Sequence, residues 1–459
     1  MIEKLNKFKE YNPDLKIRKL NKVYVIYFET LCDSTSINDF ILKPIDYSKI
    51  KTIKDVKDKL PSGNLVEAKD EKDVFNLLFS GFTLICINNS FIAFETKFAL
   101  NSGITEATNE KVTKGPKDAF TENYQINLGL IRKRIRSKNL VVKEHTIGTD
   151  SKTLVSLVYM SDIAKDDLVN KIEKRLQTMS MDYVANSNYI FENLGTSNNM
   201  LPTNLMTERP DLVSFHLMEG RVAIVVENTP QVIILPVFFN DFIKNIDDYY
   251  QNSKNISITR IIRVLALIVA IFTPALYIAL TTFNLETLPT SVLINFSIQR
   301  GGVPFPSIVE AILMWLTFEI LREADTRIPF VMGSSRSIVG ALVLGQAAVE
   351  AGMITPIMII IIAISSVASL LFNDNDMVNA IRIWKLLLLL LSAITGLYGI
   401  FIGTLLFIAK LCSMESYGFD YTLPNAPFSL KLQKNNFILT KKFKLNKRNS
   451  FLTNNTDRR

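Results

Sequence analysis

Six residues with unusual chemistry for their surroundings lie between the long uncharged stretches of the C-terminal half of the chain. They combine helix-breaking prolines with polar side chains among apolar neighbours: Pro304, Phe305, Pro306, Glu310, Gln346 and Glu350. A carboxylate among apolar residues in a membrane is costly, so it usually faces the protein interior or a water-filled path. Prolines remove backbone donors, which at such depth is tolerated only where protein or water covers the chain. We therefore predict that these residues face the protein interior or line a water-filled path.

Two carboxylates of this region cannot serve one straight path. Glu310 and Glu319 are nine residues apart, and an ideal helix turns by about 900° over that spacing, so the two side chains point to opposite sides. Glu310 lies one turn from the prolines, and we favour it as the residue that faces water. We expect Glu319 to pair with Arg322 or Arg327. The alternative is that residues 301–310 form a proline-containing loop with Glu310 at a membrane surface.

Long uncharged runs must hold these residues in place. Residues 264–283 and 353–372 are two runs of 20 without a charge, and residues 386–409 are a run of 24. At about 1.5 Å per residue, each run is long enough to cross the ~30 Å hydrocarbon layer of a membrane as one helix. Arg and Lys flank the first and last runs, which predicts that both ends are cytosolic. The number of crossings is then even, and we expect a fourth between residues 303 and 349.

The composition excludes several classes of protein. The chain has 459 residues and a formal net charge of +8, and residues 431–459 alone carry nine Lys or Arg against one Asp. The rest is electrically balanced, so a nucleic-acid-binding protein is not expected. Three cysteines without a CxxC spacing argue against a disulfide framework and against a zinc site. The first 250 residues hold no phosphate loop, HExxH or Ser/His/Asp grouping, so we expect neither catalysis nor a metal or other cofactor.

The first 250 residues have the alternating composition of small α/β units. Residues 22–31 are typical of a buried strand, residues 70–80 of an amphipathic helix and residues 82–94 of a hairpin. Residues 153–190 show a β-α-β order, whose crossover is expected to be right-handed if the strands are parallel. Residues 221–238 are typical of a second hairpin.

A very basic run, residues 132–136, ends a predicted helix at residues 119–138. We interpret it as a solvated helix face whose cations lie favourably near the helix C-terminus. A site for an anion or an acidic partner is the alternative.

These patterns predict an α/β cytosolic region of two small subdomains followed by an all-α polytopic membrane domain. The expected parts are an N-terminal α/β subdomain at 1–110, a second one at 111–258, a transmembrane domain of four to five spans at 259–413, one of them optionally re-entrant, and a basic cytosolic tail at 414–459. The tail interleaves Lys and Arg with apolar residues, which favours binding to anionic membrane lipid. Residues 241–254 are polar and aromatic, and we interpret them as the element that couples the soluble part to the membrane part.

Several motifs resemble the A subunit of the GerA-type spore germination receptors, over residues 20–430. In the soluble part the resemblance rests on Gly115-Pro116, the run LGLIRKRIR at 128–136, Thr207-Glu208-Arg209-Pro210-Asp211, residues 219–224, and Asp248-Tyr249-Tyr250. In the helical part it rests on PALYIALTTF at 274–283, GVPFP at 302–306 followed by Glu310, residues 316–324, and residues 337–352. Four of the matched residues are our candidates for coupling: Arg209, Asp248, Tyr249 and Tyr250.

The resemblance implies a non-enzymatic, multi-pass membrane subunit of a nutrient-germinant receptor in the inner membrane of a bacterial spore. In that family the A subunit works with a permease-like B subunit that binds the germinant and with a lipoprotein C subunit. It is thought to oligomerise into a ligand-gated cation channel, which implies a homo-oligomer here. The resemblance also makes the six residues named first our candidates for lining or gating an ion path. A secondary transporter or a scaffold subunit that holds the receptor together is the alternative. No internal repeat of the kind found in transporters is apparent.

Overall fold

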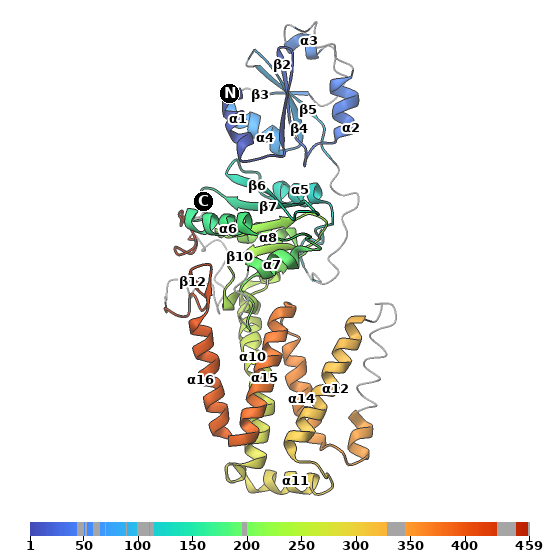
Figure 1. The fold of residues 1–459 in the computed structure, drawn as a ribbon, viewed down its shortest axis with the longest axis vertical. Coiled ribbons are helices and arrows are strands. Elements are labelled where there is room, and N and C mark those ends of the chain that lie inside the picture. The colour runs from blue at the N-terminus through green and yellow to red at the C-terminus, as the bar shows by residue number, and fades with distance from the viewer. Residues whose placement is uncertain are drawn as a thin grey trace.

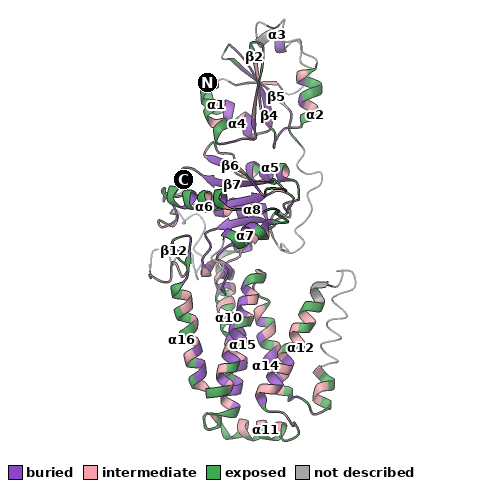
Figure 2. Ribbon diagram, in the orientation of Figure 1, coloured by how far each residue is buried: buried purple, intermediate pink, exposed green. Residues whose placement is uncertain are grey.

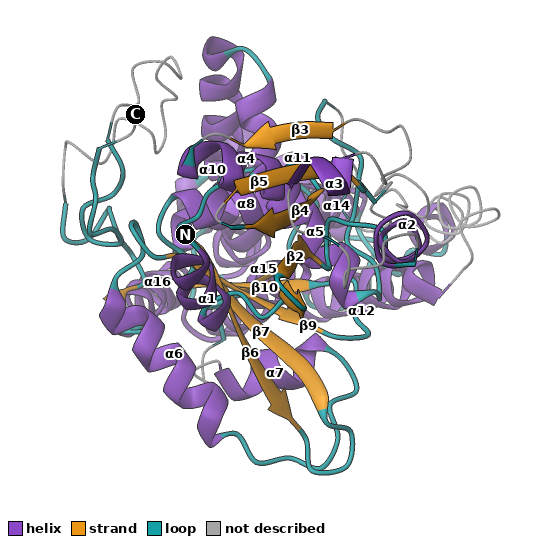
Figure 3. Ribbon diagram, turned by 90° about the horizontal axis from the view of Figure 1, so that it is seen from above, coloured by secondary structure: helices purple, strands orange, loops and turns teal. Residues whose placement is uncertain are grey.

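The computed structural model describes residues 1–43, 50, 53–57, 65–68, 70–88, 90–98, 110, 114–194, 200–327, 345–428 and 447–457. Two α/β subdomains follow one another along the long axis of the molecule, and a bundle of long helices points away from them (Figure 1). Seen from above, the strands of the first sheet run across those of the second (Figure 3). An α/β region with two sheets is followed by a helical C-terminal part. This order of parts along the chain agrees with the prediction.

The first subdomain is an antiparallel sheet of five strands in the order β1-β2-β4-β5-β3. The predicted strand at 22–31, the helix at 70–80 and the hairpin at 82–94 are confirmed as β2, α4 and the pair β4 and β5. The elements are α1 (Ile2–Glu10), β1 (Leu15–Leu20), β2 (Val23–Phe28), α2 (Ser34–Ser36), η1 (Ile37–Leu42), α3 (Ile53–Lys57), β3 (Leu65–Ala68), α4 (Glu71–Phe79), β4 (Phe82–Ile87) and β5 (Ser90–Glu95).

The second subdomain repeats this plan with strands in the order β6-β7-β9-β10-β8. The predicted hairpin at 221–238 is confirmed as β9 and β10, and Asn228 in its turn has the expected positive φ of 62°. The elements are α5 (Tyr124–Arg134), β6 (Leu140–Ile147), β7 (Thr153–Met160), α6 (Asp166–Thr178), α7 (Ser187–Leu194), β8 (Leu205–Thr207), α8 (Pro210–Met218), β9 (Val222–Val226), β10 (Val232–Leu235), α9 (Phe239–Ile243) and the 3-10 turn η2 (Ile246–Tyr250).

The β-α-β interpretation of residues 153–190 is wrong. After β7 and α6 the chain forms the helix α7 instead of a second strand, and every ladder of the second sheet is antiparallel. The buried residues of α7 are Ser187, Ile190 and Leu194. Their spacing places them on one helix face, so packing on the core decides against the β-like composition of this segment.

A buried ion pair joins the two subdomains. Arg132 in α5 is fully buried, and its Nε and Nη2 donate to the carboxylate of Asp14 at 2.7 and 2.6 Å. The guanidinium also lies 4.5 Å from the ring centroid of Phe28. The interpretation of the basic run 132–136 as a solvated face is therefore wrong for Arg132, which binds an acidic partner within the same chain.

The C-terminal part consists of long helices with a short helix across its far end (Figure 1). The starts of α12 and α14 lie close together, since a Cβ on Gly352 would come within 3.2 Å of the Gly302 carbonyl. After the last helix, Glu415 and Ser416 pair with Asp420 and Phe419 in a small antiparallel ladder. The elements are α10 (Ser253–Thr282), η3 (Leu285–Thr287), α11 (Thr290–Arg300), α12 (Ser307–Arg327), α14 (Pro356–Ser369), α15 (Asn375–Thr395), α16 (Leu397–Ser413), β11 (Glu415–Ser416) and β12 (Phe419–Asp420).

The expectation of one crossing at residues 386–409 is wrong. The run is divided at Gly396, which has φ +65° and separates α15 from α16. The two helices lie side by side (Figure 1), and a Cβ on Gly403 would collide with the side chain of Leu388. An uncharged run shows that a segment is apolar, but it carries no signal for a reversal, which a glycine with positive φ makes possible here.

Among the described residues, two helices are long and apolar enough to cross a membrane: Asn255–Thr282 and Asn375–Thr395. Pro356–Ser369 and Leu397–Ser413 are apolar but shorter. The outward faces of the bundle are largely exposed, whereas the middle strands of both sheets are largely buried (Figure 2). Large apolar side chains such as Ile394 and Tyr398 are 71% and 66% exposed, as expected where lipid or another protein covers a helix.

The end of the described chain returns to the second subdomain. Leu452 is fully buried, and Asn454 N donates to the Ile163 carbonyl at 2.9 Å. Phe451 packs edge to face on Phe238. The predicted lipid-binding tail thus falls into two parts: residues 429–446 and 458–459 lie outside the described residues, and residues 447–457 pack on protein.

Candidate functional site

The carboxylate of Asp248 connects the second subdomain to the first long helix. Asp248 lies in η2, whose first turn is capped by the side chain of Asn245. Its Oδ2 accepts from Arg260 Nε at 2.8 Å, and its Oδ1 accepts from Arg263 Nη2 at 3.0 Å. Both arginines belong to α10, and Asp248 and Arg260 are 1% and 0% exposed. The first charged turns of α10 are therefore held from inside the protein.

The neighbouring carboxylate, Asp247, belongs to a second buried ion group. It accepts from Arg209 Nη1 at 2.8 Å, while Arg209 Nε and Nη2 bind the two oxygens of Asp211 at 3.1 and 2.8 Å. Burial alone would lower the pKa of Arg209, but the two carboxylates raise it above its ordinary value. Burial would likewise raise the pKa of Asp211, and Arg209 instead holds it below 3.8. Both groups are therefore charged at neutral pH.

Two tyrosines complete the arrangement. The Tyr250 hydroxyl donates to Asp211 Oδ2 at 2.8 Å. The Tyr249 ring lies 4.7 Å from that of Phe215 in α8 and 5.7 Å from the guanidinium of Arg260. Each tyrosine thus bridges η2 to another element, Tyr250 to the start of α8 and Tyr249 to both α8 and α10.

The structure brings together all four candidate coupling residues, which are Arg209, Asp248, Tyr249 and Tyr250. Sequence reasoning missed Asp211 and Asp247 as members and treated Arg260 and Arg263 only as charges at a membrane edge. The sequence did hold a signal for this pairing. Two consecutive acids, Asp247 and Asp248, come shortly before the two arginines that begin the next predicted helix. Removing one partner of a buried ion pair typically costs about 3–5 kcal/mol, so these pairs stabilise the junction.

The last long helix is tied to the same part of the second subdomain. Beyond α16, the fully buried Tyr421 donates its hydroxyl to the Pro202 carbonyl at 2.7 Å. The Phe239 N–H in α9 donates to the Tyr421 carbonyl at 3.0 Å. Since α9 directly precedes η2, the second subdomain holds the first and the last long helix through adjacent elements.

Glu310 is buried, not exposed to an open face. Its side chain is 1% exposed, and Oε2 accepts from both the backbone N–H and the hydroxyl of Thr355 at 2.9 Å. Thr355 is the N-cap residue of α14, where a carboxylate is favourable because of the helix dipole. The expectation that Glu310 faces water is therefore wrong for the single chain. Its role in a pore remains a prediction.

The other predicted ion-path residues lie at the surface of the chain. Pro304 and Pro306 are exposed and Phe305 is half-buried, directly before α12. Gln346 and Glu350 are exposed and share a helix face as expected, since Gln346 Nε2 donates to Glu350 Oε1 at 3.0 Å. The predicted pairing of Glu319 with Arg322 is confirmed at 3.2 Å. The side chain of Arg327 lies outside the described residues.

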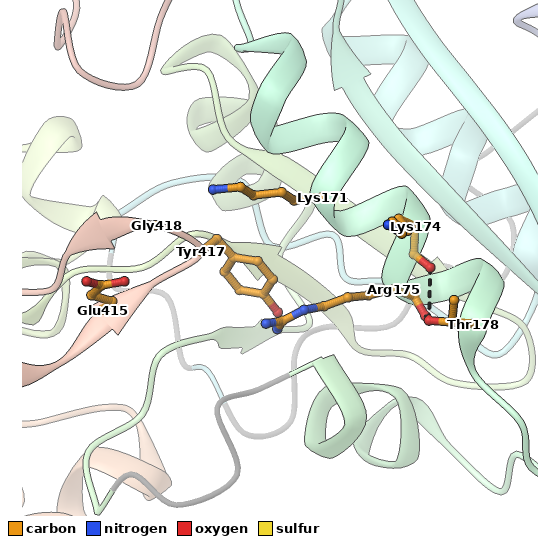
Figure 4. A pocket seen from close by; sticks show the side chains of 7 residues that line it. All are labelled: Lys171, Lys174, Arg175, Thr178, Glu415, Tyr417 and Gly418. Carbon is orange, nitrogen blue, oxygen red and sulfur yellow. Dashed lines mark hydrogen bonds between the residues drawn. The ribbon is translucent and has the colours of Figure 1, made fainter.

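A groove of about 510 Å³ lies between α6 and the β11–β12 ladder (Figure 4). None of the sequence-predicted site residues lines it. The Arg175 guanidinium lies 5.2 Å from the Tyr417 ring centroid, and its Nη1 donates to the Leu194 carbonyl at 2.7 Å. The groove is lined by Lys171, Lys174, Arg175, Thr178, Glu415, Tyr417 and Gly418.

Comparison with known proteins supports the resemblance seen in the motifs. The model of the family described as "Bacillus/Clostridium GerA spore germination protein" matches residues 3–451. Spore germination protein KA of Bacillus subtilis (strain 168) is 35% identical over 91% of this chain and 78% of its own length. The uncharacterized membrane protein YfkQ of the same organism is 32% identical over 90% of this chain and 82% of its own length. The crystal structure of the N-terminal domain of the A subunit of the Bacillus megaterium spore germinant receptor GerK3 covers 52% of this chain and 95% of its own, with 29% identity and a TM-score of 0.37. The chain therefore belongs to the GerA family of Bacillus/Clostridium spore germination proteins.

Proposed function

We propose that the chain is a membrane subunit of a spore nutrient-germinant receptor, and that it forms an oligomeric ligand-gated cation channel that triggers germination. Family membership and the relatives named as spore germination proteins support the process. A relative named as a membrane protein and two helices of sufficient length support insertion. The observation that carries the mechanism is the pair of adjacent carboxylates, Asp247 and Asp248, which join the second subdomain to α10.

In this proposal the helical part spans the membrane several times, with both α/β subdomains and the tail on the cytosolic side. The described end of the tail packs on the second subdomain, so both lie at the same end of the bundle. Arg260 and Arg263 at the start of α10 favour the cytosol for that end. The partners are a permease-like B subunit, a lipoprotein C subunit and further copies of this chain. Neither an enzymatic activity nor nucleic-acid binding is part of the proposal.

The packing provides a path from the junction to the predicted ion path. Along α10, the Ala270 carbonyl accepts from the Ser365 hydroxyl of α14 at 2.7 Å. Further along, Tyr277 and Ile278 of α10 pack with residues of α12 and α14 in one apolar cluster. Glu310 joins the same two helices through Thr355. A displacement of η2 would therefore reach this contact through α10, since packed helices move as units.

We assign the six predicted ion-path residues to two roles. Glu310 acts as a gate contact, because its buried carboxylate holds the start of α14 against α12. Exposed prolines, the half-buried Phe305 between them and exposed polar residues provide the wall of the path once copies assemble, since rings of carboxylates attract cations. These wall residues are Pro304, Phe305, Pro306, Gln346 and Glu350.

The experiment that tests the channel uses spores that carry the full receptor. Cation release into rich medium is recorded with an ion-selective electrode for the chain as it is, for Glu350→Gln, and for Glu286→Gln as an exposed control outside the path. We expect slower release for Glu350→Gln at normal receptor abundance and no change for the control. The alternative functions are a secondary transporter and a scaffold. For a scaffold, cation release should follow receptor abundance alone. Unchanged release in Glu350→Gln would therefore favour the scaffold.

A further inference from the structure

A cluster of cations lies between α12 and α15, away from the junction and from Glu310. Glu319 Oε2 accepts from Arg382 Nη1 at 2.9 Å and lies 3.2 Å from Arg322 Nη2. Arg322 Nη2 also lies 3.5 Å from Asn379 Oδ1. Since residue 319 faces 382 and residue 322 faces 379, the two helices are antiparallel here. One carboxylate oxygen is thus shared between two guanidinium groups.

Two further donors extend this contact by one helical turn. Lys385 follows Arg382 by three residues on α15, its side chain is only 5% exposed, and no hydrogen bond to its ammonium group is found within the described part of the chain. Trp315 precedes Glu319 by four residues on α12, and its buried Nε1 lacks a partner among the described residues. An ammonium group and an indole N–H can only donate. Within the described part of the chain, the cluster therefore has donors without acceptors.

The charge of the cluster is also unbalanced. Among the side chains that the structure describes, Arg322, Arg382 and Lys385 stand against Glu319, and counting the exposed Glu323 one turn further still leaves an excess of cations. Cations that outnumber the carboxylates in a largely buried site are costly to keep charged. An anion with several acceptor oxygens would balance this excess.

The position of the cluster identifies the chemistry of this anion. On α12 the residues between Glu310 and Glu319 carry no charge, and on α15 residues 386–395 carry none. Both helices thus change from charged to apolar at the level of Glu319, Arg382 and Lys385. In a membrane-inserted helix this change marks the headgroup region, where Lys, Arg and Trp are typical.

We propose that Arg322, Arg382, Lys385 and the Trp315 indole bind the phosphate of an anionic phospholipid in the leaflet that faces the α/β subdomains. Basic pockets between membrane helices on the cytosolic side bind such headgroups. The inference rests on the membrane insertion proposed above. It also places the α12–α15 contact outside any cation path, because an excess of positive charge repels cations.

The test uses the full chain in a neutral detergent, titrated with phosphatidylglycerol, with phosphatidylcholine or with inorganic phosphate. Bound lipid is counted by native mass spectrometry. Because the chain has two tryptophans, a Trp384→Phe background makes the fluorescence of Trp315 a reporter at the site. We expect saturable binding of phosphatidylglycerol, about tenfold weaker in Lys385→Met, since a hydrogen bond to a charged group contributes about that factor. Lys410→Met in α16 is the matched control and should bind normally.

Each other outcome counts against the inference. Equal affinity for phosphatidylcholine would exclude an anionic lipid as the specific ligand. Saturation by inorganic phosphate alone would indicate a small-anion site. No lipid binding in a chain that purifies as an oligomer would mean that a carboxylate of another copy fills the position. Because Lys385→Met removes a buried charge without a hydrogen-bonded partner, it should not lower the unfolding temperature in lipid-free detergent, so lost binding cannot be ascribed to misfolding. Absence of the chain from membrane fractions would overturn the proposed function, whereas lack of lipid binding in a membrane-inserted chain overturns only this inference.

Discussion

The Asp248 carboxylate accepts a hydrogen bond from Arg260 Nε at 2.8 Å, and neither side chain is more than 1% exposed. Twelve residues separate them, and the chain between them passes from the last turn of the second subdomain into α10. The pair therefore fixes the direction in which the long helix leaves the α/β region. Together with the Tyr421 contacts beyond α16, it holds the second subdomain against the long helices.

Asp248→Asn should uncouple the junction. The change removes the carboxylate charge that both Arg260 and Arg263 bind, and breaking a buried ion pair costs about 3–5 kcal/mol. We expect both receptor abundance and nutrient-triggered germination to fall, measured by immunoblot and by loss of spore optical density. Arg263→Gln is the milder test, because Arg263 is 14% exposed, and should slow germination at normal abundance. Asp150→Asn, an exposed control, should change neither, and normal germination in both junction variants would refute coupling through this pair.

Arg132→Leu should loosen the first subdomain from the second. It leaves Asp14 buried without its cation, at a cost of about 3–5 kcal/mol, whereas Arg136→Leu at the exposed end of the same run should cost less than about 0.5 kcal/mol. Hydrogen exchange of the full chain reports the difference. We expect faster exchange in β1 and β2 for Arg132→Leu only. Equal exchange in the two variants would mean that other contacts hold the subdomains together.

Glu310→Gln distinguishes a gate contact from a lumen residue. The amide keeps the volume but has one acceptor oxygen and no charge, so its bond to the N-cap of α14 is weakened by about 1–3 kcal/mol. A gate contact then opens more readily, and cation release without nutrient should rise. Thr355→Val removes the hydroxyl that donates to Glu310 and should also raise cation release without nutrient. The control Glu286→Gln should leave cation release unchanged. Slower nutrient-triggered release in Glu310→Gln, with Thr355→Val unaffected, would instead support a carboxylate facing the lumen.

Gly396→Ala should impair the α15–α16 hairpin. Gly396 has φ +65°, and a Cβ there would lie 2.8 Å from Cβ of Phe283 and 3.0 Å from Oδ1 of Asn284. Strain at a positive φ together with these contacts should cost more than about 1 kcal/mol. Receptor abundance in membranes should fall. Gly302→Ala is the matched control, because no atom lies within 4 Å of its added Cβ, and an equal loss in both would argue against the hairpin.

The stability of the second subdomain should depend on pH through Glu110. Its Oε2 accepts from the Thr207 hydroxyl at 2.6 Å, and burial raises its pKa from 4.5 to about 7. A carboxyl whose pKa is raised on folding stabilises the fold below its unfolded pKa, and this contribution is lost as the pH rises through the folded pKa. The unfolding temperature should therefore fall between about pH 4.5 and 7 and flatten in Glu110→Gln. An unchanged slope in that variant, matching the exposed control Glu122→Gln, would exclude Glu110 as the source.

The sequence by itself determined most of the local elements and their order, though not the helix α7. The helical spacing of apolar residues predicted α4 and α6, alternating apolar runs predicted the two hairpins, and the long uncharged runs predicted apolar helices. Motifs along the chain also identified the family. These features depend on backbone preferences and on which face of a segment is apolar, and both are written in neighbouring residues.

Only the tertiary structure decided which charged groups are buried and with whom. Arg132 reaches Asp14 across 118 residues of sequence, and Glu310 reaches Thr355 across 45. The reversal at Gly396 depends on the packing of α16 against α15. Neither a partner nor a reversal has a local signature, because each depends on how distant segments pack together, and a buried charge is tolerated only where that packing supplies its counter-charge.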